Sequence, residues 1–219
     1  MTTFADLGLS PKIVAALEAT TLKTPTPIQV QAIPHIMKGS DLMGLAQTGT
    51  GKTAAFGLPL LHRLLELNHP PGPRHIRALI LAPTRELVTQ INDNLTIFTK
   101  GTATKVTMVV GGASINKQAE RLARGSDILV ATPGRLVDHL RRDEKVLSTI
   151  QHLVLDEADE MLKLGFMDDL EVIFDAIPAS RQTVLFSATL PSSIRSIAER
   201  HLREPKHVKI QSKTQTVTA

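Results

Sequence analysis

Four carboxylates stand together in the segment LVLDEADEMLKLGF, residues 153–166. Asp156, Glu157, Asp159 and Glu160 follow directly on an apolar run that is typical of a buried strand. Acidic residues are common in the first turn of a helix, where they meet the positive end of the helix dipole. The alternative is that the cluster faces a cation, and the choice depends on whether the chain supplies something for that cation to hold.

A second segment, AQTGTGKT at residues 46–53, could supply it. Gly49 and Gly51 allow the backbone to curl so that its N–H groups point inward at a phosphate. Lys52 can then reach the β- and γ-phosphates of a nucleotide, and Thr53 can ligate Mg²⁺. The usual pattern begins with glycine and this one begins with alanine. The strand predicted before it and the helix after it nevertheless favour a phosphate loop over an incidental glycine-rich turn.

The carboxylates and the phosphate loop are predicted to meet, because ligands of open α/β folds bind at the carboxyl ends of the strands. Asp156 closes one predicted strand and the phosphate loop follows another, so Asp156 can hold the Mg²⁺ that bridges the phosphates. Glu157 can orient and activate the attacking water, whereas the helix dipole is a sufficient reason for Glu160. These residues predict a site for ATP or ADP with Mg²⁺.

Short apolar runs alternate with amphipathic stretches along the chain. The runs lie at 41–46, 77–82, 105–110, 127–131, 152–156, 183–188 and 207–210, and the stretches include 51–67, 84–98, 114–123, 133–140 and 191–201. Apolar strands separated by helices indicate a parallel sheet covered on both faces, and right-handed crossovers make it doubly wound. The sequence therefore predicts a single α/β domain with a doubly wound, mostly parallel sheet.

Two further helices are predicted ahead of the first strand, at 11–19 and 27–37. Each follows a serine or threonine that can cap it and has proline at its first position. Residues 68–75 are rich in proline and are expected to form a surface loop, and the polar stretch 211–219 is expected to be a linker or tail.

The composition sets limits on compartment and partners. Of the 219 residues 42% are hydrophobic and none is cysteine, which excludes a disulfide framework and thiolate metal sites. No stretch is typical of a membrane span or a signal peptide, so the cytoplasm is the expected compartment and no membrane partner is expected. The net charge of +4 permits nucleic acid as a partner. With six Phe, no Trp and no Tyr, a base-stacking surface is not expected, and the RNA backbone is the expected handle.

Seven short motifs follow one another in a fixed order: PTPIQ (25–29), AQTGTGKT (46–53), PTRELVTQ (83–90), GG (111–112), TPGR (132–135), DEAD (156–159) and SAT (187–189). In type, order and spacing they resemble the N-terminal RecA-like domain of DEAD-box ATP-dependent RNA helicases. The resemblance covers the chain from Phe4 to about residue 210. It implies a RecA-like P-loop NTPase fold and an ATPase that couples Mg-ATP hydrolysis to the unwinding of RNA duplexes.

The resemblance also implies roles on the nucleotide side. Gln29 would read the adenine edge through its amide, and Phe4 would stack on the base. The residues expected to bind the nucleotide are Phe4, Gln29, Thr48, Gly49, Thr50, Gly51, Lys52 and Thr53. Lys52, Asp156 and Glu157 are the expected catalytic residues, and Thr53 and Asp156 would hold Mg²⁺, partly through water. Ser187 and Thr189 would hydrogen-bond to Asp159 and couple the nucleotide state to domain closure.

On the RNA side the resemblance implies contacts with the sugar-phosphate backbone from Pro83, Thr84, Arg85, Gly111, Gly112, Thr132, Pro133, Gly134 and Arg135. Each has a structural alternative. Thr84 and Thr132 can be helix N-caps, the two glycines can be a strand-to-helix turn, and Phe4 can be a core residue. Several helix N-termini at one edge of a sheet nevertheless suit a polyanion, since each presents free N–H groups.

Two departures from the family pattern bear on the function. Thr21 and Leu22 stand where a glycine and an aromatic residue are usual, which weakens the adenine-site inference. Nothing like the second RecA-like domain follows the first. We therefore expect residues 1–39 to belong to a core domain that continues over 40–210, with residues 211–219 leading to a second domain in a longer chain.

The isolated domain is expected to be monomeric and to show little activity. The alternatives are an RNA-binding module that binds nucleotide without turnover, and a P-loop ATPase acting on DNA or protein.

Overall fold

Residues 1–210 are described by a computed structural model, and the prediction for 211–219 falls outside them. Their centre is one seven-stranded sheet, in which every paired strand is parallel to its neighbour and the order is β3-β4-β2-β5-β6-β1-β7. The strands are β1 (Leu42–Leu45), β2 (Ile76–Leu81), β3 (Val106–Val109), β4 (Ser126–Ala131), β5 (His152–Leu155), β6 (Gln182–Ser187) and β7 (Lys206–Lys209). The predicted doubly wound parallel sheet is confirmed.

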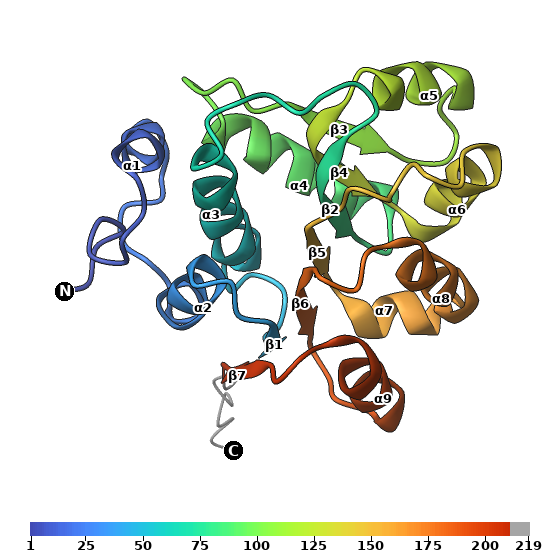
Figure 1. The fold of residues 1–219 in the computed structure, drawn as a ribbon. Coiled ribbons are helices and arrows are strands. Elements are labelled where there is room, and N and C mark those ends of the chain that lie inside the picture. The colour runs from blue at the N-terminus through green and yellow to red at the C-terminus, as the bar shows by residue number, and fades with distance from the viewer. Residues whose placement is uncertain (211–219) are drawn as a thin grey trace.

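Helices cover both faces of this sheet (Figure 1). One layer holds α1 (Pro11–Glu18), α2 (Pro27–Met37), α3 (Lys52–Leu65) and α4 (Arg85–Phe98). The other holds α5 (Ile115–Ala123), α6 (Pro133–Arg142), α7 (Ala158–Lys163), α8 (Met167–Ala176) and α9 (Ser192–His201). None of these helices, over the residues described, is long and apolar enough to cross a membrane.

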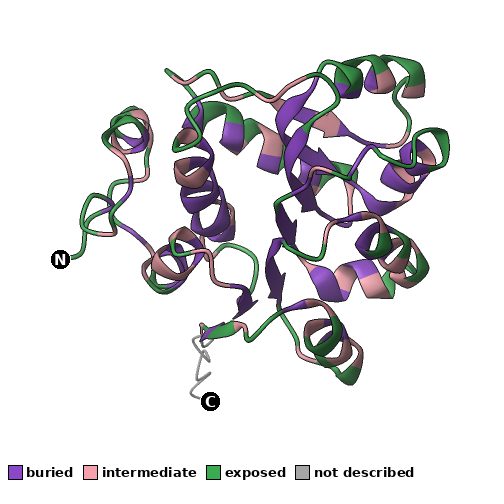
Figure 2. Ribbon diagram, viewed as in Figure 1, coloured by how far each residue is buried: buried purple, intermediate pink, exposed green. Residues whose placement is uncertain are grey.

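The two layers create two hydrophobic cores. Residues within one strand alternate between them: in β2, Ala78 and Ile80 belong to the first core, while Leu79 and Leu81 belong to the second. Every residue of β2, β4, β5 and β6 is buried, and Figure 2 shows the strands and the inner sides of the helices as buried. Because both faces are covered, these strands are mainly apolar, and their polar residues lie at the strand ends.

All seven predicted strands form within a residue or two of the expected positions. Helix α8 was not predicted, whereas α7 begins at the carboxylates, where the sequence indicated the first turn of a helix. Gly165 separates the two helices at a φ of +87°. Ser10 and Thr26 occupy the N-cap positions of α1 and α2, each followed by proline, as predicted. The hydroxyl of Ser10 makes no capping bond, and α2 begins with a capping box in which Gln29 Oε1 accepts from Thr26 N at 3.0 Å. The hydroxyl of Thr26 donates to the carbonyl of Thr50, 2.8 Å away across the fold.

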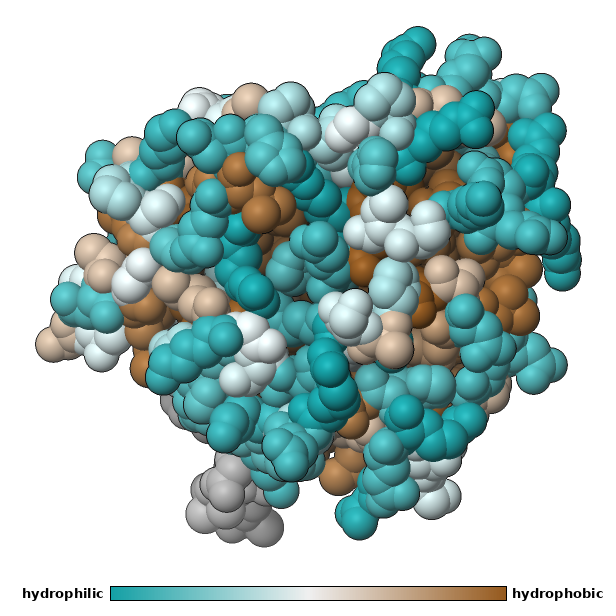
Figure 3. All heavy atoms as spheres, viewed as in Figure 1, coloured by the Kyte–Doolittle hydropathy of each residue, from teal (hydrophilic) through white to brown (hydrophobic). Residues whose placement is uncertain are grey.

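On the face shown in Figure 3, hydrophilic residues cover most of the surface and hydrophobic residues form small, separate patches. Within residues 1–210 the large hydrophobic side chains that are clearly exposed are Met1, Leu67, Ile97, Leu164 and Val172. They are spread over the N-terminus, α3, α4 and the α7–α8 region. The site must therefore be sought in polar hollows at the edges of the sheet.

Candidate functional site

The carboxyl edge of the sheet brings together the residues with chemistry. Strands β5, β6 and β1 are neighbours in the sheet. The phosphate loop (46–53) follows β1, the carboxylates follow β5, and Ser187 ends β6. The backbone N–H of Ala46 donates to Ser187 O at 3.1 Å, which fixes the start of the phosphate loop against the end of β6. Motifs far apart in the sequence thus meet at one edge, as predicted.

The phosphate loop is held open by two glycines and by α2. Gly49 and Gly51 both have a φ of +86°, a conformation that glycine adopts without strain. A Cβ atom on Gly51 would lie 2.5 Å from Gln29 Nε2. That side chain donates from Nε2 to Gly51 O at 3.1 Å, and its Oε1 accepts from Thr26 N at 3.0 Å. Gln29 is fully buried and braces the loop, a contact that the sequence did not reveal.

Lys52 and Asp156 form a buried ion pair, with Lys52 Nζ 3.4 Å from Asp156 Oδ1. The lysine is 8% exposed and the aspartate 1%. This contact is too long for a good hydrogen bond, and Asp156 Oδ1 has no hydrogen-bond donor among the residues described. Burial raises the pKa of Asp156, and Lys52 opposes that rise. The carboxylate therefore has Lys52 as its ion-pair partner, but its Oδ1 has no hydrogen-bond donor and could accept a cation.

The donor set at this point suits a magnesium ion bound mainly by its ligand. Asp156 supplies a carboxylate oxygen, and Thr53, in the first turn of α3, lines the same cavity. Within residues 1–210 no cluster of three or more His, Cys, Asp or Glu residues could hold a metal by itself. Mg²⁺ prefers oxygen ligands and is commonly bound by one or two protein groups together with phosphates and waters. The residues present fit that mode.

Glu157 lies beside this pair in a left-handed backbone conformation, with a φ of 53°. Non-glycine residues adopt that conformation at a cost of about 1–3 kcal/mol, and such residues are concentrated at functional sites. Its side chain is partly buried. Burial raises its pKa, Lys52 opposes the rise, and the neighbouring Asp156 adds to it. A raised pKa suits a carboxylate that must accept a proton.

Asp159 connects the carboxylates to the end of β6. Its Oδ2 accepts from the hydroxyl of Thr189 at 2.9 Å and from the backbone N–H of Thr189 at 3.2 Å. Burial alone would raise the pKa of Asp159, but these bonds and others outweigh it and hold the pKa below its usual value. The hydroxyl of Ser187 donates to the carbonyl of Thr189 at 2.8 Å. The contact predicted between Thr189 and Asp159 is present. Ser187 also contributes to the lowered pKa of Asp159, although the carbonyl of Thr189 accepts from its hydroxyl.

Two cavities open at this edge. One of about 360 Å³ is lined by phosphate-loop residues and Thr53, by Gln29, and by Asp156 and Glu157. A second, of about 210 Å³, lies against Lys52 and Glu157 and is also lined by Pro83 and Thr84. The predicted nucleotide residues Thr48 and Lys52 line both cavities. They form a continuous set around the carboxylates.

One wall of the larger cavity was not predicted. It comes from α4, whose Leu87, Gln90 and Asn94 line the cavity, and from Thr21 and Leu22. Gln90 lies inside the motif PTRELVTQ, which was assigned to RNA contacts. The motif therefore also contains a residue that lines the cavity on the nucleotide side. Thr21 and Leu22 are the residues that depart from the family pattern, and both line the cavity that Gln29 also lines.

Phe4 and Thr50 are the predicted nucleotide residues that line neither cavity. Phe4 is 4% exposed and packs in the first hydrophobic core. This is the structural alternative for Phe4, and its contact with a base stays a prediction. The hydroxyl of Thr50 donates to the carbonyl of Gln47 at 2.8 Å, and its own carbonyl accepts from Thr26. Thr50 shapes the loop from within.

The residues predicted for RNA lie on the other half of the same edge. Strands β3, β4 and β2 are neighbours, so the turns that carry Gly111–Gly112, Thr132–Arg135 and Pro83–Arg85 meet there. Arg85 is exposed and rests on Gly112, where an added Cβ would lie 2.6 Å from Arg85 Nη1. Thr84 caps α4 by accepting from Leu87 N at 3.2 Å, whereas Thr132 makes no such bond for α6.

The two arginines of this half differ. Arg135 is turned inward: its Nη1 donates to Ala113 O at 2.8 Å and to Gln118 Oε1 at 3.1 Å. Gln118 Oε1 also accepts from His139 Nε2 at 2.9 Å, and Gln118 Nε2 donates to Val110 O at 2.8 Å, so the turn after β3 is tied to α6. Burial and the nearby Arg135 lower the pKa of His139. No sequence pattern predicted this network. Because Arg135 is hydrogen-bonded within it, Arg85 is the arginine of this half that is exposed to solvent.

Comparison with known proteins agrees with this geometry. The model of the DEAD/DEAH box helicase family matches residues 26–197. The chain is 44% identical over 217 residues to the DEAD-box ATP-dependent RNA helicase CshA of Bacillus cereus, covering 99% of this chain and 40% of the relative. It is 49% identical over 216 residues to the ATP-dependent RNA helicase DeaD of Escherichia coli K12, covering 98% and 34%.

A solved structure shares the fold. The crystal structure of a DEAD box protein from Methanococcus jannaschii superposes with a TM-score of 0.88 at 34% identity, covering 96% of this chain and 56% of that one. The chain thus spans roughly a third to just over half of the proteins that it matches. Its fold is that of the RecA-like domain of such a protein. By family match, relatives and fold, the chain belongs to the DEAD/DEAH box helicases.

Proposed function

We propose that this chain is the ATP- and RNA-binding N-terminal core of a DEAD-box RNA helicase. Joined to a second RecA-like domain, it would couple Mg-ATP hydrolysis to the unwinding of RNA duplexes. The relatives named above are ATP-dependent RNA helicases, which supports the proposal. The observation that carries it is the buried Lys52–Asp156 pair beside the phosphate loop, in which the carboxylate oxygen Oδ1 has no hydrogen-bond donor among the described residues.

Nucleotide binding would exchange the partners of this pair. Lys52 would turn from Asp156 to the β- and γ-phosphates, and the loop N–H groups around Gly49 and Gly51 would bind the remaining phosphate oxygens. Asp156 and the Thr53 hydroxyl would hold Mg²⁺, partly through water, and the bound ion would supply positive charge against the phosphates. Both buried charges of the pair keep a partner throughout, so the exchange avoids a free buried charge.

Glu157 would accept the proton of the attacking water. Its position beside Lys52 and Asp156 and its raised pKa support this role. Asp159 would report the state of the site to the turn at 187–189, since Thr189 holds it by two hydrogen bonds. Ser187 would act on the same turn through the carbonyl of Thr189. These contacts would link the chemistry to closure against the second domain.

The adenine base would lie in the larger cavity beside Gln29. Its amide already makes one bond from Nε2 and one to Oε1, which leaves one N–H and one lone pair to read a base. Gln90 and Asn94 of α4 would add polar groups to the lining of this cavity, which also includes Thr21 and Leu22. Residues 1–39 would thus be an integral part of the core domain that continues over 40–210.

RNA would bind through its backbone at the turns that follow β2, β3 and β4. The N-termini of α4, α5 and α6 gather there, and each presents N–H groups to an anion. Arg85 supplies an exposed cation at this point. With few aromatic side chains, recognition would be indifferent to base sequence. The second RecA-like domain would supply the other half of the RNA site.

Calorimetry of Mg·ADP binding tests the nucleotide site. Asp156→Asn should weaken binding at least tenfold, because the amide cannot replace the carboxylate toward Mg²⁺. Asp175→Asn makes the same change on the exposed side of α8 and should leave binding within twofold. Equal loss in both variants, or none in either, would contradict the assignment. RNA-stimulated phosphate release by the chain joined to its second domain then separates a helicase from a binding module without turnover.

A further inference from the structure

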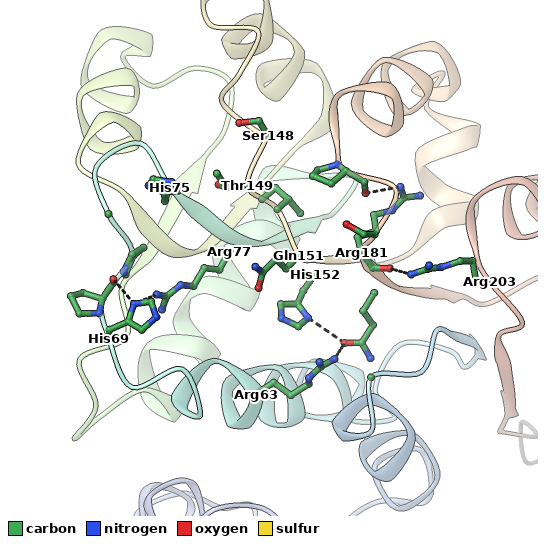
Figure 4. A pocket seen from close by; sticks show the side chains of 18 residues that line it. Arg63, His69, His75, Arg77, Ser148, Thr149, Gln151, His152, Arg181 and Arg203 are labelled. Carbon is green, nitrogen blue, oxygen red and sulfur yellow. Dashed lines mark hydrogen bonds between the residues drawn. The ribbon is translucent and has the colours of Figure 1, made fainter.

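The opposite edge of the sheet contains a cavity that no motif announces. It has a volume of about 790 Å³ and lies where β2, β5 and β6 begin, beside the end of α3. Figure 4 shows Arg77, Gln151 and His152 projecting from the strand ends, with Arg63 reaching toward them from α3. The phosphate loop and the carboxylates lie at the other ends of the same strands. The cavity is therefore separate from the candidate nucleotide site.

Basic residues dominate its lining. Four arginines and three histidines line it, namely Arg63, Arg77, Arg181, Arg203, His69, His75 and His152. Among the lining residues, all within the described part of the chain, none is Asp or Glu and none is Phe. We refer to this space as the amino-edge cavity.

The arginine charges are largely uncompensated. Arg63 donates to Gln182 Oε1 at 2.7 Å, and Arg203 donates to Arg181 O at 2.9 Å, so both meet neutral acceptors. Arg77 is the exception, with a carboxylate of Asp127 at 3.1 Å. A second carboxylate, Asp41, lies behind the lining, where backbone N–H groups of residues 183 and 203 occupy it.

The ends of the helices account for only part of this charge. Arg181 donates to the carbonyls of Pro178 and His201, and such contacts stabilise helix C-termini. Arg63 lies in the last turn of α3 but reaches across to Gln182 of β6 instead of its own helix end. The guanidinium groups of Arg63 and Arg77 thus lie beside the starts of the strands, and neither of them caps a helix.

The positive charge in this cavity affects the titration of His152. It is buried, and its Nδ1 lies 3.2 Å from Gln182 Oε1, the oxygen that also accepts from Arg63. Burial and the charge of Arg63 lower the pKa of His152 to about 4. A buried imidazole next to an unpaired arginine stays neutral until an anion enters. With an anion present, His152 gains a reason to become a donor as well.

We propose that the amino-edge cavity binds a compact polyphosphate anion. Its volume lies within the range of about 300–1,000 Å³ that is usual for small-ligand sites. Guanidinium groups match phosphate oxygens in charge and geometry. A single-stranded RNA would need a basic groove that tracks its backbone, whereas here the basic groups surround one hollow. A small, highly charged phosphate ligand is the better match.

Residue-resolved NMR with inorganic tripolyphosphate tests this at constant ionic strength and without Mg²⁺. Because the phosphate loop also attracts this probe, the readout is the imidazole of His152 together with the backbone amides of residues 151–152. We expect saturable shifts there and a rise in the pKa of His152 on binding. Shifts confined to residues 46–53, or non-saturating shifts that sulfate reproduces at the same ionic strength, would overturn the proposal.

A pair of variants makes the test specific. Arg63→Gln with Arg203→Gln removes two lining charges and should weaken the amino-edge shifts at least tenfold. Arg141→Gln removes one charge from an exposed position on α6 and should change them less than twofold. Unchanged binding in the double variant would refute the proposal. So would displacement of tripolyphosphate from His152 by an RNA decamer that binds there more tightly, since the ligand would then be RNA.

Discussion

The two edges of the sheet attract phosphate by different means. At the carboxyl edge the chain uses backbone N–H groups, since the phosphate loop and the N-termini of α4, α5 and α6 all face that way. At the amino edge the helices end instead, and their carbonyls favour cations, so the positive charge there must come from side chains such as Arg63 and Arg203. Sites made from backbone leave glycine-rich motifs in a sequence. Sites made from scattered side chains do not.

Each edge also buries one titratable group that burial drives toward its neutral form. Asp156 lies at the carboxyl end of β5, where burial raises its pKa. His152 lies at the amino end of the same strand, where burial and Arg63 lower its pKa to about 4. A cation bound at the carboxyl edge would favour the charged form of Asp156, and an anion bound at the amino edge would favour the charged form of His152. If the edges are independent, changes at one should leave the other unaffected.

The largest expected effect breaks the chemistry at the carboxyl edge alone. In the chain joined to its second domain, Glu157→Gln should lower ATP turnover by about 10²–10⁴-fold, because the amide cannot accept a proton. Binding of Mg·ATP should persist, as the shape is kept. Arg203→Gln at the amino edge is the control and should keep the normal rate. Turnover is measured by phosphate release with saturating RNA, and a normal rate for Glu157→Gln would exclude Glu157 as the base.

Next in size is the stability lost when the buried pair is broken. Lys52→Ala removes the partner of Asp156 and should lower the free energy of unfolding by about 3–5 kcal/mol at neutral pH. Adding Asp156→Asn should recover part of that loss, since no buried charge then remains. Lys163→Ala breaks an exposed pair with Glu160 and should cost less than about 1 kcal/mol. Urea denaturation of the four proteins measures this, and equal losses for the two lysines would contradict the role of burial.

At the amino edge, His152 should make stability depend on pH. Its folded pKa of about 4 lies below the ordinary 6.5, so the unfolded chain binds the proton more readily. The contribution of His152 is therefore present above pH 6.5 and is lost as the pH falls toward 4. At about 1.4 kcal/mol per pKa unit, the loss amounts to about 3 kcal/mol. His152→Gln should flatten the urea-denaturation profile over this range, whereas His75→Gln, exposed on the same rim, should not.

The contrast between sites made from local motifs and sites made from scattered side chains also explains which features could be predicted from the sequence. Strands and phosphate loop were predictable because apolar runs and glycine-rich turns are local signals. The brace of Gln29 and Thr26 on the phosphate loop was not, since it joins α2 to residues 50 and 51. Helix α8 was missed because it starts after Phe166 without a capping hydrogen bond, so its start has no cap signal in the sequence. The amino-edge cavity joins residues from 39 to 203, a separation at which no motif can operate.

A smaller effect tests how specific the carboxyl edge is. Gln29 has one free N–H and one free lone pair in a fixed order, because Thr26 and Gly51 hold the rest of the amide. One order matches adenine and leaves unpaired groups against guanine, so ADP should bind about tenfold or more tightly than GDP. Gln29→Ala should remove the preference and also loosen the phosphate loop. Calorimetry with both nucleotides decides, and equal affinities in the wild type would refute the reading.

The smallest expected effect distinguishes the two arginines of the RNA half. Arg85 is exposed and rests on Gly112, so its guanidinium is free to meet a phosphate. Arg135 is committed to Ala113 and Gln118. Arg85→Gln should therefore weaken RNA binding equally for all base sequences and reduce the slope of log affinity against log salt by about 0.7, the value of one contact with a single strand. Arg135→Gln should mainly lower stability, because the turn at 111–113 loses its anchor on α6. Fluorescence anisotropy over a salt series separates the two, and identical slopes for Arg85→Gln and the wild type would remove Arg85 from the RNA site.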